Sequence, residues 1–364
     1  MYSIQVDRTF QQIIKIFYQI GIWQNDEESN FRKTGKKLFY TFFEVVCINA
    51  VVYVKFLYLL FKKHEILAFL NDQFVVHAIE NRQEYEQTNE KLKKFVKFIR
   101  PYYLALFITV VLLIVTKLPI FSADRGLPFF ISFSWNDSEI VYWLAYLFVS
   151  LSTLLYDIIN LITILIWYMM LNYSIEYELL GNKLHGLGAR RETIQPMVKN
   201  QKNIELQQRS MFVEDLIVVM KVHQNLKETI ERFRSFFSTL FLGQITTSGI
   251  VICVSIYSLA FASKENILQT QMHTCTLLYG VFDSFFVMYL ANNITVASDR
   301  LSYCLFESNW IERTESCKRY VLILGEVLRQ PQELIILTYP MNLETFMTII
   351  NGAYRMFNIL KNFQ

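Results

Sequence analysis

The sequence has too little charge and too few loop-forming residues for a soluble protein of its size. Only 18% of its 364 residues are charged, whereas soluble domains average about a quarter. It has 6 prolines and 11 glycines, and no segment is rich in proline, glycine and serine. These scarcities exclude a disordered chain, a collagen and two soluble domains joined by a linker. Because 53% of the residues are hydrophobic and 16% aromatic, the composition predicts a polytopic α-helical membrane protein.

Cysteine is also scarce, and it is not grouped. The five cysteines stand at positions 47, 253, 275, 304 and 317, with no CxxC pair and no spacing typical of metal ligands. A secreted disulfide scaffold and a metal site are therefore not indicated, and we expect small buried hydrophobes. The net charge of +3 is too small and too dispersed for a protein that binds nucleic acid.

The motifs of the common enzyme classes are missing. No HExxH, GxSxG, P-loop or GxGxxG sequence occurs, and the glycine pair at 186 and 188 follows no strand-like segment. The five histidines are isolated from one another. Residues 1–23 lack the apolar core of a signal peptide, so we expect the first membrane span to direct insertion. The sequence predicts no enzyme, no cofactor and no metal ion.

Six apolar runs are long enough for helices that cross a bilayer, which requires roughly 20 residues. The last run contains Glu344 and Arg355, so either it is a helix that faces water or protein rather than lipid, or it does not span the membrane. The strand-like alternation of an outer-membrane barrel is absent. The runs cover residues 38–61, 102–121, 140–171, 235–262, 274–298 and 334–360.

The distribution of lysine and arginine between these runs predicts the topology. Residues 62–101 contain eight, 172–234 ten and 299–333 five, while 122–139 and 263–273 contain one each. The basic segments should therefore lie in the cytoplasm, and the C-terminus outside. The two longer basic segments mix both signs of charge at helical spacing, so we expect helices that extend from the spans into the cytoplasm.

The first 37 residues do not fit this alternation. They contain six lysines and arginines, yet only the run 38–61 separates them from the next basic segment. Three explanations are open. Residues 9–23 could lie in the membrane interface as an amphipathic helix, residues 38–61 could form a re-entrant hairpin, or a span of an ancestral protein could be missing.

Glu44, Lys55, Asp157 and Asp283 are charged residues well inside the apolar runs, where an unpaired charge is costly. Asp157 and Asp283 could hydrogen-bond to neighbouring helices, or they could border a water-filled cavity. Glu44 and Lys55 are eleven residues apart and share a helix face. We expect them to reach the interface or to pair across helices.

Aromatic residues give the positive signal for a binding site. They are concentrated in the outer halves of the runs 140–171 and 274–298. If these two helices pack together, they enclose an apolar pocket with a few hydroxyl groups, which is the usual composition of a small-molecule site. Otherwise they are ordinary interface and core residues. The candidate ligand-binding residues are Tyr142, Tyr146, Phe148, Ser150, Tyr279, Phe282 and Phe286.

One predicted outer loop carries a glycosylation sequon. Asn136-Asp137-Ser138 lies between the second and third runs. Because this segment is predicted to lie outside the cell, Asn136 is a candidate glycosylation site.

The last third of the chain contains a series of motifs. Ala297-Ser298-Asp299-Arg300-Leu301 is followed by Tyr303, Trp310 and Lys318-Arg319-Tyr320, and then by Leu328-Arg329-Gln330-Pro331-Gln332, Asn342-Leu343-Glu344-Thr345-Phe346, Ala353-Tyr354 and Phe357. Their order and spacing resemble the C-terminal signature of the insect odorant receptors, the seven-span olfactory receptor family. More loosely, Gly21-Ile22-Trp23 resembles the family's N-terminal approach, and Leu127-Pro128-Phe129 with Trp135 resembles its second outer loop.

The resemblance implies an all-α fold with the N-terminus inside and the C-terminus outside. Members of this family act as odorant-gated, non-selective cation channels with a shared co-receptor subunit. By this comparison the chain would be the ligand-tuning subunit of a hetero-oligomer, expected to be a tetramer, in the plasma membrane of a sensory dendrite. Its partners would be the co-receptor, membrane lipid and a volatile apolar small molecule, with no nucleic acid.

The resemblance also implies a division of the chain. Residues 1–37 would be a cytoplasmic segment, residues 38–298 the ligand-binding helices, and residues 299–364 a cytoplasmic anchor with a pore-lining last helix. The co-receptor has small aliphatic and amide residues at the pore positions, so a chain with bulky and basic residues there fits one or two walls of a mixed channel. The matching residues are Phe357, Leu360 and Lys361.

The front of the chain allows further alternatives. Residues 32–50 and 56–70 resemble the start of the family's first span and the exit from its second, so the part between them would be missing. The chain would then be an alternative transcript, an incomplete gene model or a decayed, non-functional receptor. A gustatory receptor of the same superfamily fits less well, because Pro340 follows Thr338-Tyr339. A G-protein-coupled receptor is more distant, since its Asn-Pro-x-x-Tyr motif is absent.

Overall fold

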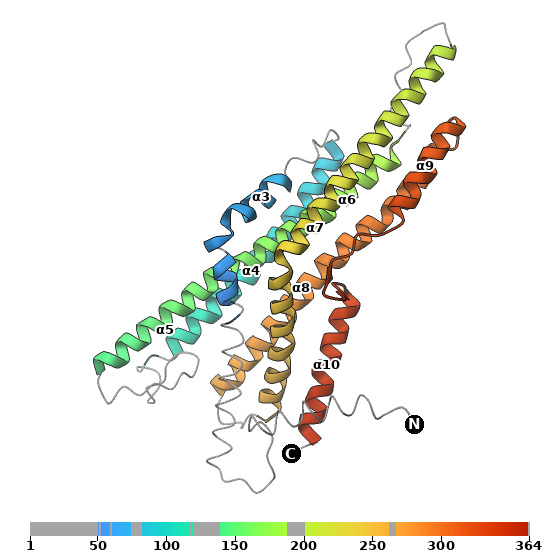
Figure 1. Ribbon diagram of the computed structural model, residues 1–364. Coiled ribbons are helices and arrows are strands. Elements are labelled where there is room, and N and C mark those ends of the chain that lie inside the picture. The colour runs from blue at the N-terminus through green and yellow to red at the C-terminus, as the bar shows by residue number, and fades with distance from the viewer. Residues whose placement is uncertain are drawn as a thin grey trace, which may run out of the picture.

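The computed structural model describes residues 50, 52–58, 60–73, 82–116, 118, 139–187, 201–261 and 267–362. These residues form an elongated bundle of helices (Figure 1). Residues 52–58 are helical, and two-residue strands β1 (Ile335–Ile336) and β2 (Tyr339–Pro340) pair antiparallel. The labelled helices are α3 (Lys63–Gln73), α4 (Arg82–Thr116), α5 (Glu139–Ile159), α6 (Leu161–His185), α7 (Gln201–Phe261), α8 (Ile267–Phe306), α9 (Glu315–Leu328) and α10 (Leu343–Asn362).

Within the described residues, four helical stretches are long and apolar enough to cross a membrane. They are Arg82–Thr116, Glu139–His185, Met211–Ala260 and Thr270–Phe306. They contain most of the second to fifth predicted runs, and the chain is a multi-pass membrane protein. The helices also continue into the basic segments: α7 begins at Gln201 and α8 ends at Phe306.

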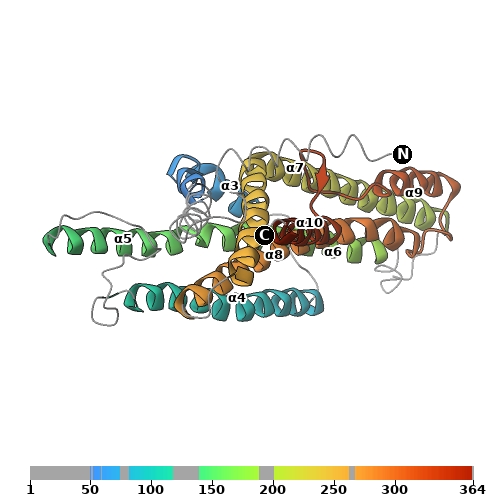
Figure 2. The ribbon, with the colours of Figure 1, turned by 90° about the horizontal axis from the view of Figure 1, so that it is seen from below.

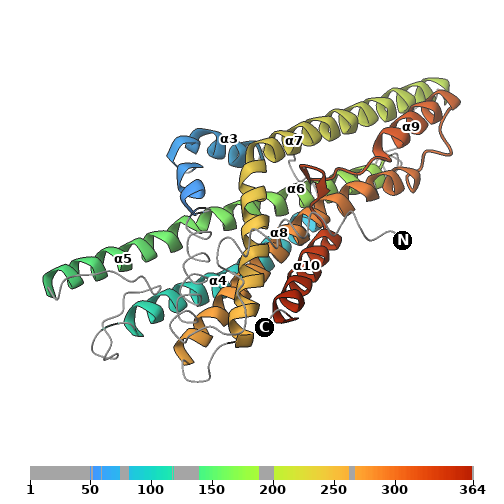
Figure 3. The same ribbon diagram turned by 60° about the horizontal axis from the view of Figure 1, so that its bottom comes forward.

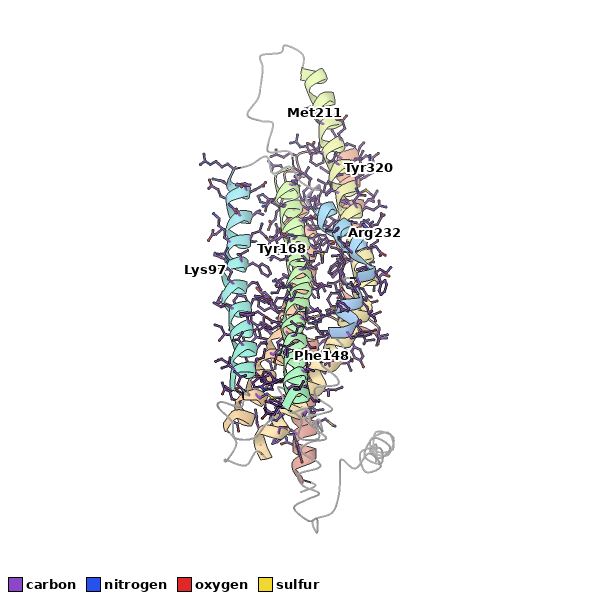
Figure 4. The ribbon with its side chains drawn as sticks, turned by 90° about the vertical axis from the view of Figure 1, so that its left-hand side faces the viewer. Lys97, Phe148, Tyr168, Met211, Arg232 and Tyr320 are labelled. Carbon is purple, nitrogen blue, oxygen red and sulfur yellow. The ribbon has the colours of Figure 1, made fainter. Side chains whose placement is uncertain are left out.

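The core lies where α6 packs against α7 and α8. Trp167, Met169, Met170, Tyr173 and Tyr177 of α6 are each at most 1% exposed, so this helix is covered by protein on most sides. Helices α3 and α4 also contact α6. Helices α5 and α9 lie at opposite ends of the bundle (Figures 2 and 3), and α9 packs there on α7 and α8. Figure 4 shows Met211 of α7 and Tyr320 of α9 toward one end and Phe148 of α5 toward the other.

The last predicted span, 334–360, is wrong at its start. The helix begins at Leu343, and the residues before it form the β1–β2 hairpin. Pro340 has no backbone N–H and favours an extended residue before it. The side-chain oxygen Oδ1 of Asn342 then accepts a hydrogen bond from the backbone N of Thr345 at 2.8 Å, which is the geometry of a helix N-cap.

Candidate ligand-binding site

Three of the predicted site residues lie on one face of α8. Tyr279, Phe282 and Phe286 are spaced by three and four residues, so they follow one another along the helix surface. The ring centroid of Phe286 is 4.8 Å from that of Trp167 in α6 and 4.9 Å from that of Phe98 in α4. The ring centroid of Tyr102 in α4 is 6.0 Å from that of Phe282. We call these residues together the α8 aromatic face: Phe98, Tyr102, Trp167, Tyr279, Phe282 and Phe286.

A buried polar network adjoins one end of this face. The hydroxyl of Tyr279 lies 3.5 Å from Oδ1 of Asn160, at the junction of α5 and α6. The Lys55 ammonium, from helical residues 52–58, donates to Oγ1 of Thr163 at 2.8 Å and to Asn160 Oδ1 at 3.4 Å. The α8 aromatic face therefore joins a few fixed polar groups to a wall of aromatic rings.

A buried group of opposite charge also lies within electrostatic reach of Lys55. The Lys55 ammonium and the Asp283 carboxylate of α8 attract each other electrostatically, and both side chains are at most 3% exposed. Asp283 in turn accepts a hydrogen bond from Nε2 of Gln244 in α7 at 2.5 Å. Through its bonds to Asn160 and Thr163, Lys55 is connected across helices, in line with one of the two sequence alternatives. We call Lys55, Gln244 and Asp283, with Asn160, Thr163 and Tyr279, the Lys55 network.

The second intramembrane aspartate also has a partner. The hydroxyl of Tyr103 in α4 donates to the Asp157 carboxylate of α5, and Asp157 is 3% exposed. For both aspartates the described contacts correspond to hydrogen bonds between helices, which was the first of the two alternatives. Such bonds fix neighbouring helices against each other, because the alternative is a bare carboxylate in an apolar environment.

The candidate residues of α5 lie in a different place. Tyr142 and Tyr146 are buried against Ile114 and Leu118 of the α4 end, and the Tyr146 hydroxyl donates to the carbonyl of Ile114. The main partners of α8 are α6 and α7 rather than α5. The predicted pocket required the outer half of the run 140–171 to pack on α8, and Tyr142 and Tyr146 do not form such a contact. The inner half of that run is the beginning of α6, and α6 does pack on α8.

The remaining candidates are placed as follows. Phe148 is 71% exposed, and Ser150 is half-buried one turn after Tyr146. Phe357 is half-buried in α10. Leu360 and Lys361 also belong to α10, but their side chains lie outside the described residues, as does the whole of Asn136.

Another surface of α8 contacts α10. The ring of Phe285, adjacent to Phe286, lies edge-on to Phe346 of α10 with centroids 5.4 Å apart. Consecutive helical residues point about 100° apart, so one helix serves both contacts. A Cβ atom on Gly249 of α7 would lie 3.8 Å from Ile349, so α10 also packs closely on α7.

Sequence reasoning missed the partners of the α8 residues. Phe98 and Tyr102 of α4 are four residues apart, a spacing that marks one helix face. However, Phe98 lay in the segment 62–101, which was assigned to the cytoplasm, and Tyr102 was only the first residue of the predicted run 102–121. Trp167 lies near the inner end of its predicted run and was not selected. Asn160 and Thr163 carried no signal of their own, since single amide and hydroxyl groups are common in apolar helices.

The comparison with protein families decides between the remaining classes of membrane protein. The family model described as 7tm Odorant receptor matches residues 30–354. The chain belongs to the 7tm odorant receptor family. This membership confirms the resemblance drawn from the C-terminal motifs, and the similar curated proteins are named odorant receptors.

Individual odorant receptors are similar to parts of the chain. Odorant receptor 46a, isoform B, of Drosophila melanogaster is 24% identical over 230 residues, which are 61% of this chain and 56% of that protein. Odorant receptor 94a of Drosophila melanogaster is 26% identical over 248 residues, 67% of this chain and 60% of that protein. The matched region thus spans less than two thirds of either relative.

Solved odorant receptor structures show the same fold. The insect olfactory receptor OR5 from Machilis hrabei aligns with a TM-score of 0.69 at 13% identity, over 96% of this chain and 98% of that chain. The structure of OR5 in complex with eugenol aligns with a TM-score of 0.66 at 14% identity, over 98% and 100% of the two chains.

Proposed function

We propose that this odorant receptor is the ligand-binding subunit of an odorant-gated cation channel that it forms with a shared co-receptor. The single observation that carries the proposal is the α8 aromatic face with the Lys55 network at its end. Aromatic walls with a few fixed polar groups are the usual composition of a small-molecule site. The plasma membrane of an olfactory dendrite, with the C-terminus outside, is the proposed location.

The composition of the site defines the class of ligand. Rings dominate the α8 aromatic face, so affinity would come mainly from apolar surface removed from water, at about 25 cal/mol per Å². The hydroxyl of Tyr279 and the neighbouring Asn160 give one polar end. The proposed ligand is a small, volatile, mostly apolar molecule with one hydrogen-bonding oxygen. The complex of OR5, which has the same fold, with eugenol is in keeping with this class.

The contacts of α8 suggest how binding could open a channel. Phe286 faces the proposed ligand site, and the adjacent Phe285 contacts Phe346 of α10. A ligand that binds better when α8 is displaced shifts the population toward that arrangement, and α10 moves with it. Phe357, Leu360 and Lys361 of α10 are the proposed pore-facing residues, and Asn136 is the proposed glycan site.

Not every candidate of the sequence stays in the proposed site. Tyr142, Tyr146 and Ser150 are proposed as outer contacts between α4 and α5. Phe148 is left out, because a side chain that is 71% exposed does not help to enclose a ligand.

The test is whole-cell current during a panel of odorants, with the chain expressed alone and with an insect co-receptor. We expect current only when both are present. Phe286→Ala should then raise the concentration for half-maximal current roughly 2- to 12-fold, since an aromatic pair is worth about 0.5–1.5 kcal/mol. Phe148→Ala is the matched control and should leave that concentration unchanged.

Two results contradict the proposal in different ways. Silence with the co-receptor, at normal surface abundance and while another odorant receptor responds in the same cells, contradicts a channel subunit. Equal ligand sensitivity of Phe286→Ala and Phe148→Ala contradicts the assignment of the ligand site to the α8 aromatic face.

A further inference from the structure

The segment between α9 and β1 is tied to two other helices through one buried residue. Gln332 is 5% exposed. Its backbone N donates to Oγ of Ser298 in α8 at 2.8 Å, and its carbonyl accepts from Oγ1 of Thr295 in α8 at 3.2 Å. The backbone of this residue is thus held on both sides by hydroxyl groups of one helix.

The side chain of Gln332 reaches a third element. Its Nε2 donates to Oε1 of Glu231 in α7 at 2.7 Å. The other carboxylate oxygen of Glu231 pairs with Nη2 of Arg234 at 2.6 Å, and Nη1 of Arg234 donates to the carbonyl of Ile335 in β1 at 3.3 Å. Hydrogen bonds to an ionised group are stronger than neutral ones, so Glu231 is a strong attachment point. We call Glu231, Arg234, Thr295, Ser298 and Gln332 the Gln332 clamp.

The clamp continues into the base of α10. The backbone N of Met341 donates to the carbonyl of Leu334 at 2.8 Å, which joins the two sides of the β1–β2 hairpin. Oγ1 of Thr345, in the first turn of α10, donates to the carbonyl of Pro340 at 2.7 Å. Hydrogen bonds, joined by short stretches of backbone, therefore connect α7 and α8 through the hairpin to α10.

We propose that Gln332 is a positioning residue that fixes the base of α10 to α7 and α8, so that a displacement of these helices is passed to α10. The last part of this inference rests on the proposed function, in which α10 lines the conduction path. The contact of Phe285 with Phe346 acts further along α10. The clamp and this contact both attach α8 to α10. The clamp also includes α7, which in addition packs on α10 directly where Gly249 lies close to Ile349.

The charges of the clamp allow a sharp test. Gln332→Glu places a second carboxylate against Glu231, which reverses an attraction with little change in shape. The double variant Glu231→Gln with Gln332→Glu has the same total charge as the original protein. Its new amide at position 231 can donate a hydrogen bond to its new carboxylate at position 332. Gln330→Glu is the matched control, because Gln330 is exposed two residues away and receives the same substitution.

The primary measurement is amide hydrogen exchange of the purified, full-length protein in detergent. In Gln332→Glu we expect exchange at least tenfold faster in residues 335–346, with α6 unchanged. The double variant should recover at least half of the lost protection on a logarithmic scale, and Gln330→Glu should match the unchanged protein. Unchanged exchange in Gln332→Glu, or no recovery in the double variant, overturns the proposal.

The second measurement addresses the transfer of movement to α10. In cells that also express the co-receptor, Gln332→Glu should lower the maximal odorant-evoked current per surface receptor at least threefold, and the double variant should restore it. Faster exchange with a current equal to that of Gln330→Glu overturns the transfer. If the unchanged protein conducts with no odorant, the proposed function fails, while the exchange experiment still decides whether the clamp holds α10.

Discussion

Replacement of Lys55 by methionine tests whether the intramembrane charges are paired. Methionine has nearly the length of lysine but no charge. The change removes the hydrogen bonds to Thr163 Oγ1 and Asn160 Oδ1, at 2.8 and 3.4 Å. It also leaves the Asp283 carboxylate, which is 3% exposed, without its cation.

The magnitude follows from the burial of both groups. Removal of one partner of a buried ion pair costs about 3–5 kcal/mol, whereas apolar or neutral replacement of both is often nearly neutral. We therefore expect Lys55→Met to lose about 3–5 kcal/mol of unfolding free energy. The double variant Lys55→Met with Asp283→Asn should lose less than about 2 kcal/mol, because an asparagine oxygen still accepts the hydrogen bond from Gln244.

The assay heats the detergent-solubilised, fluorescently tagged protein and measures, by size-exclusion chromatography, how much stays folded. The temperature at which half is lost is the thermal midpoint. One kcal/mol shifts the midpoint of a 150–250-residue domain by about 2–4 °C, and less in a longer chain. Lys55→Met should lower the midpoint by roughly 5 °C. The control is Lys62→Met, since the pair of Lys62 with Glu65 is half-exposed on both sides and such pairs are worth about 0–1 kcal/mol.

Two outcomes refute this reasoning. If Lys55→Met lowers the midpoint no more than Lys62→Met, the buried ammonium contributes no net stabilisation. If the double variant is as unstable as the sum of its single changes, Lys55 and Asp283 are not coupled, and the electrostatic attraction between them has no energetic consequence.

Three further predictions concern the α8–α9 contact, the start of α10 and the topology. In Gly325→Ala, the new Cβ would lie 2.6 Å from Cζ of Phe306, so the thermal midpoint should fall by the equivalent of about 1–3 kcal/mol. Adding Phe306→Leu to the same chain should restore the midpoint. If the midpoint stays low in this double variant, the clash with Phe306 is not the cause. Asn342→Ala removes the N-cap of α10, worth about 1 kcal/mol, and should speed amide exchange in the first turn of α10 several-fold, while the exposed, mid-helix Asn351→Ala should not. An epitope tag after Gln364 should be stained on intact cells, and staining only after permeabilisation contradicts an external C-terminus.

The sequence predicted most spans because their signal is local. Run length identified the helices now seen as α4 to α8, and mixed charge at helical spacing predicted the long extension of α7 toward Gln201. The start of α10 was missed because the run 334–360 is apolar throughout its first part. There Pro340 and the cap at Asn342 decide where the helix begins, and apolar content carries no information about such backbone chemistry.

Only the α8 residues of the candidate site were predicted from the sequence, and their partners on α4 and α6 were not. Aromatic composition selected Tyr279, Phe282 and Phe286 in the outer half of the run 274–298, and their spacing puts them on one face of α8. The spacing could not show which helix covers that face. Tyr142 and Tyr146 pack on α4 instead, and the true partners come from segments more than a hundred residues away. The pairing of Lys55 with Asn160 and Thr163 is equally non-local.

The adjacency of Phe285 and Phe286 has a consequence for how such a receptor can diversify. Phe286 lies against Trp167 and Phe98, while Phe285 lies against Phe346. Substitutions at 279, 282 and 286 alter one face of α8 and leave the α10 contact intact. Descendants of a duplicated gene could therefore acquire new chemical preferences without rebuilding the link to α10, since one residue of offset separates the variable face from the constrained one.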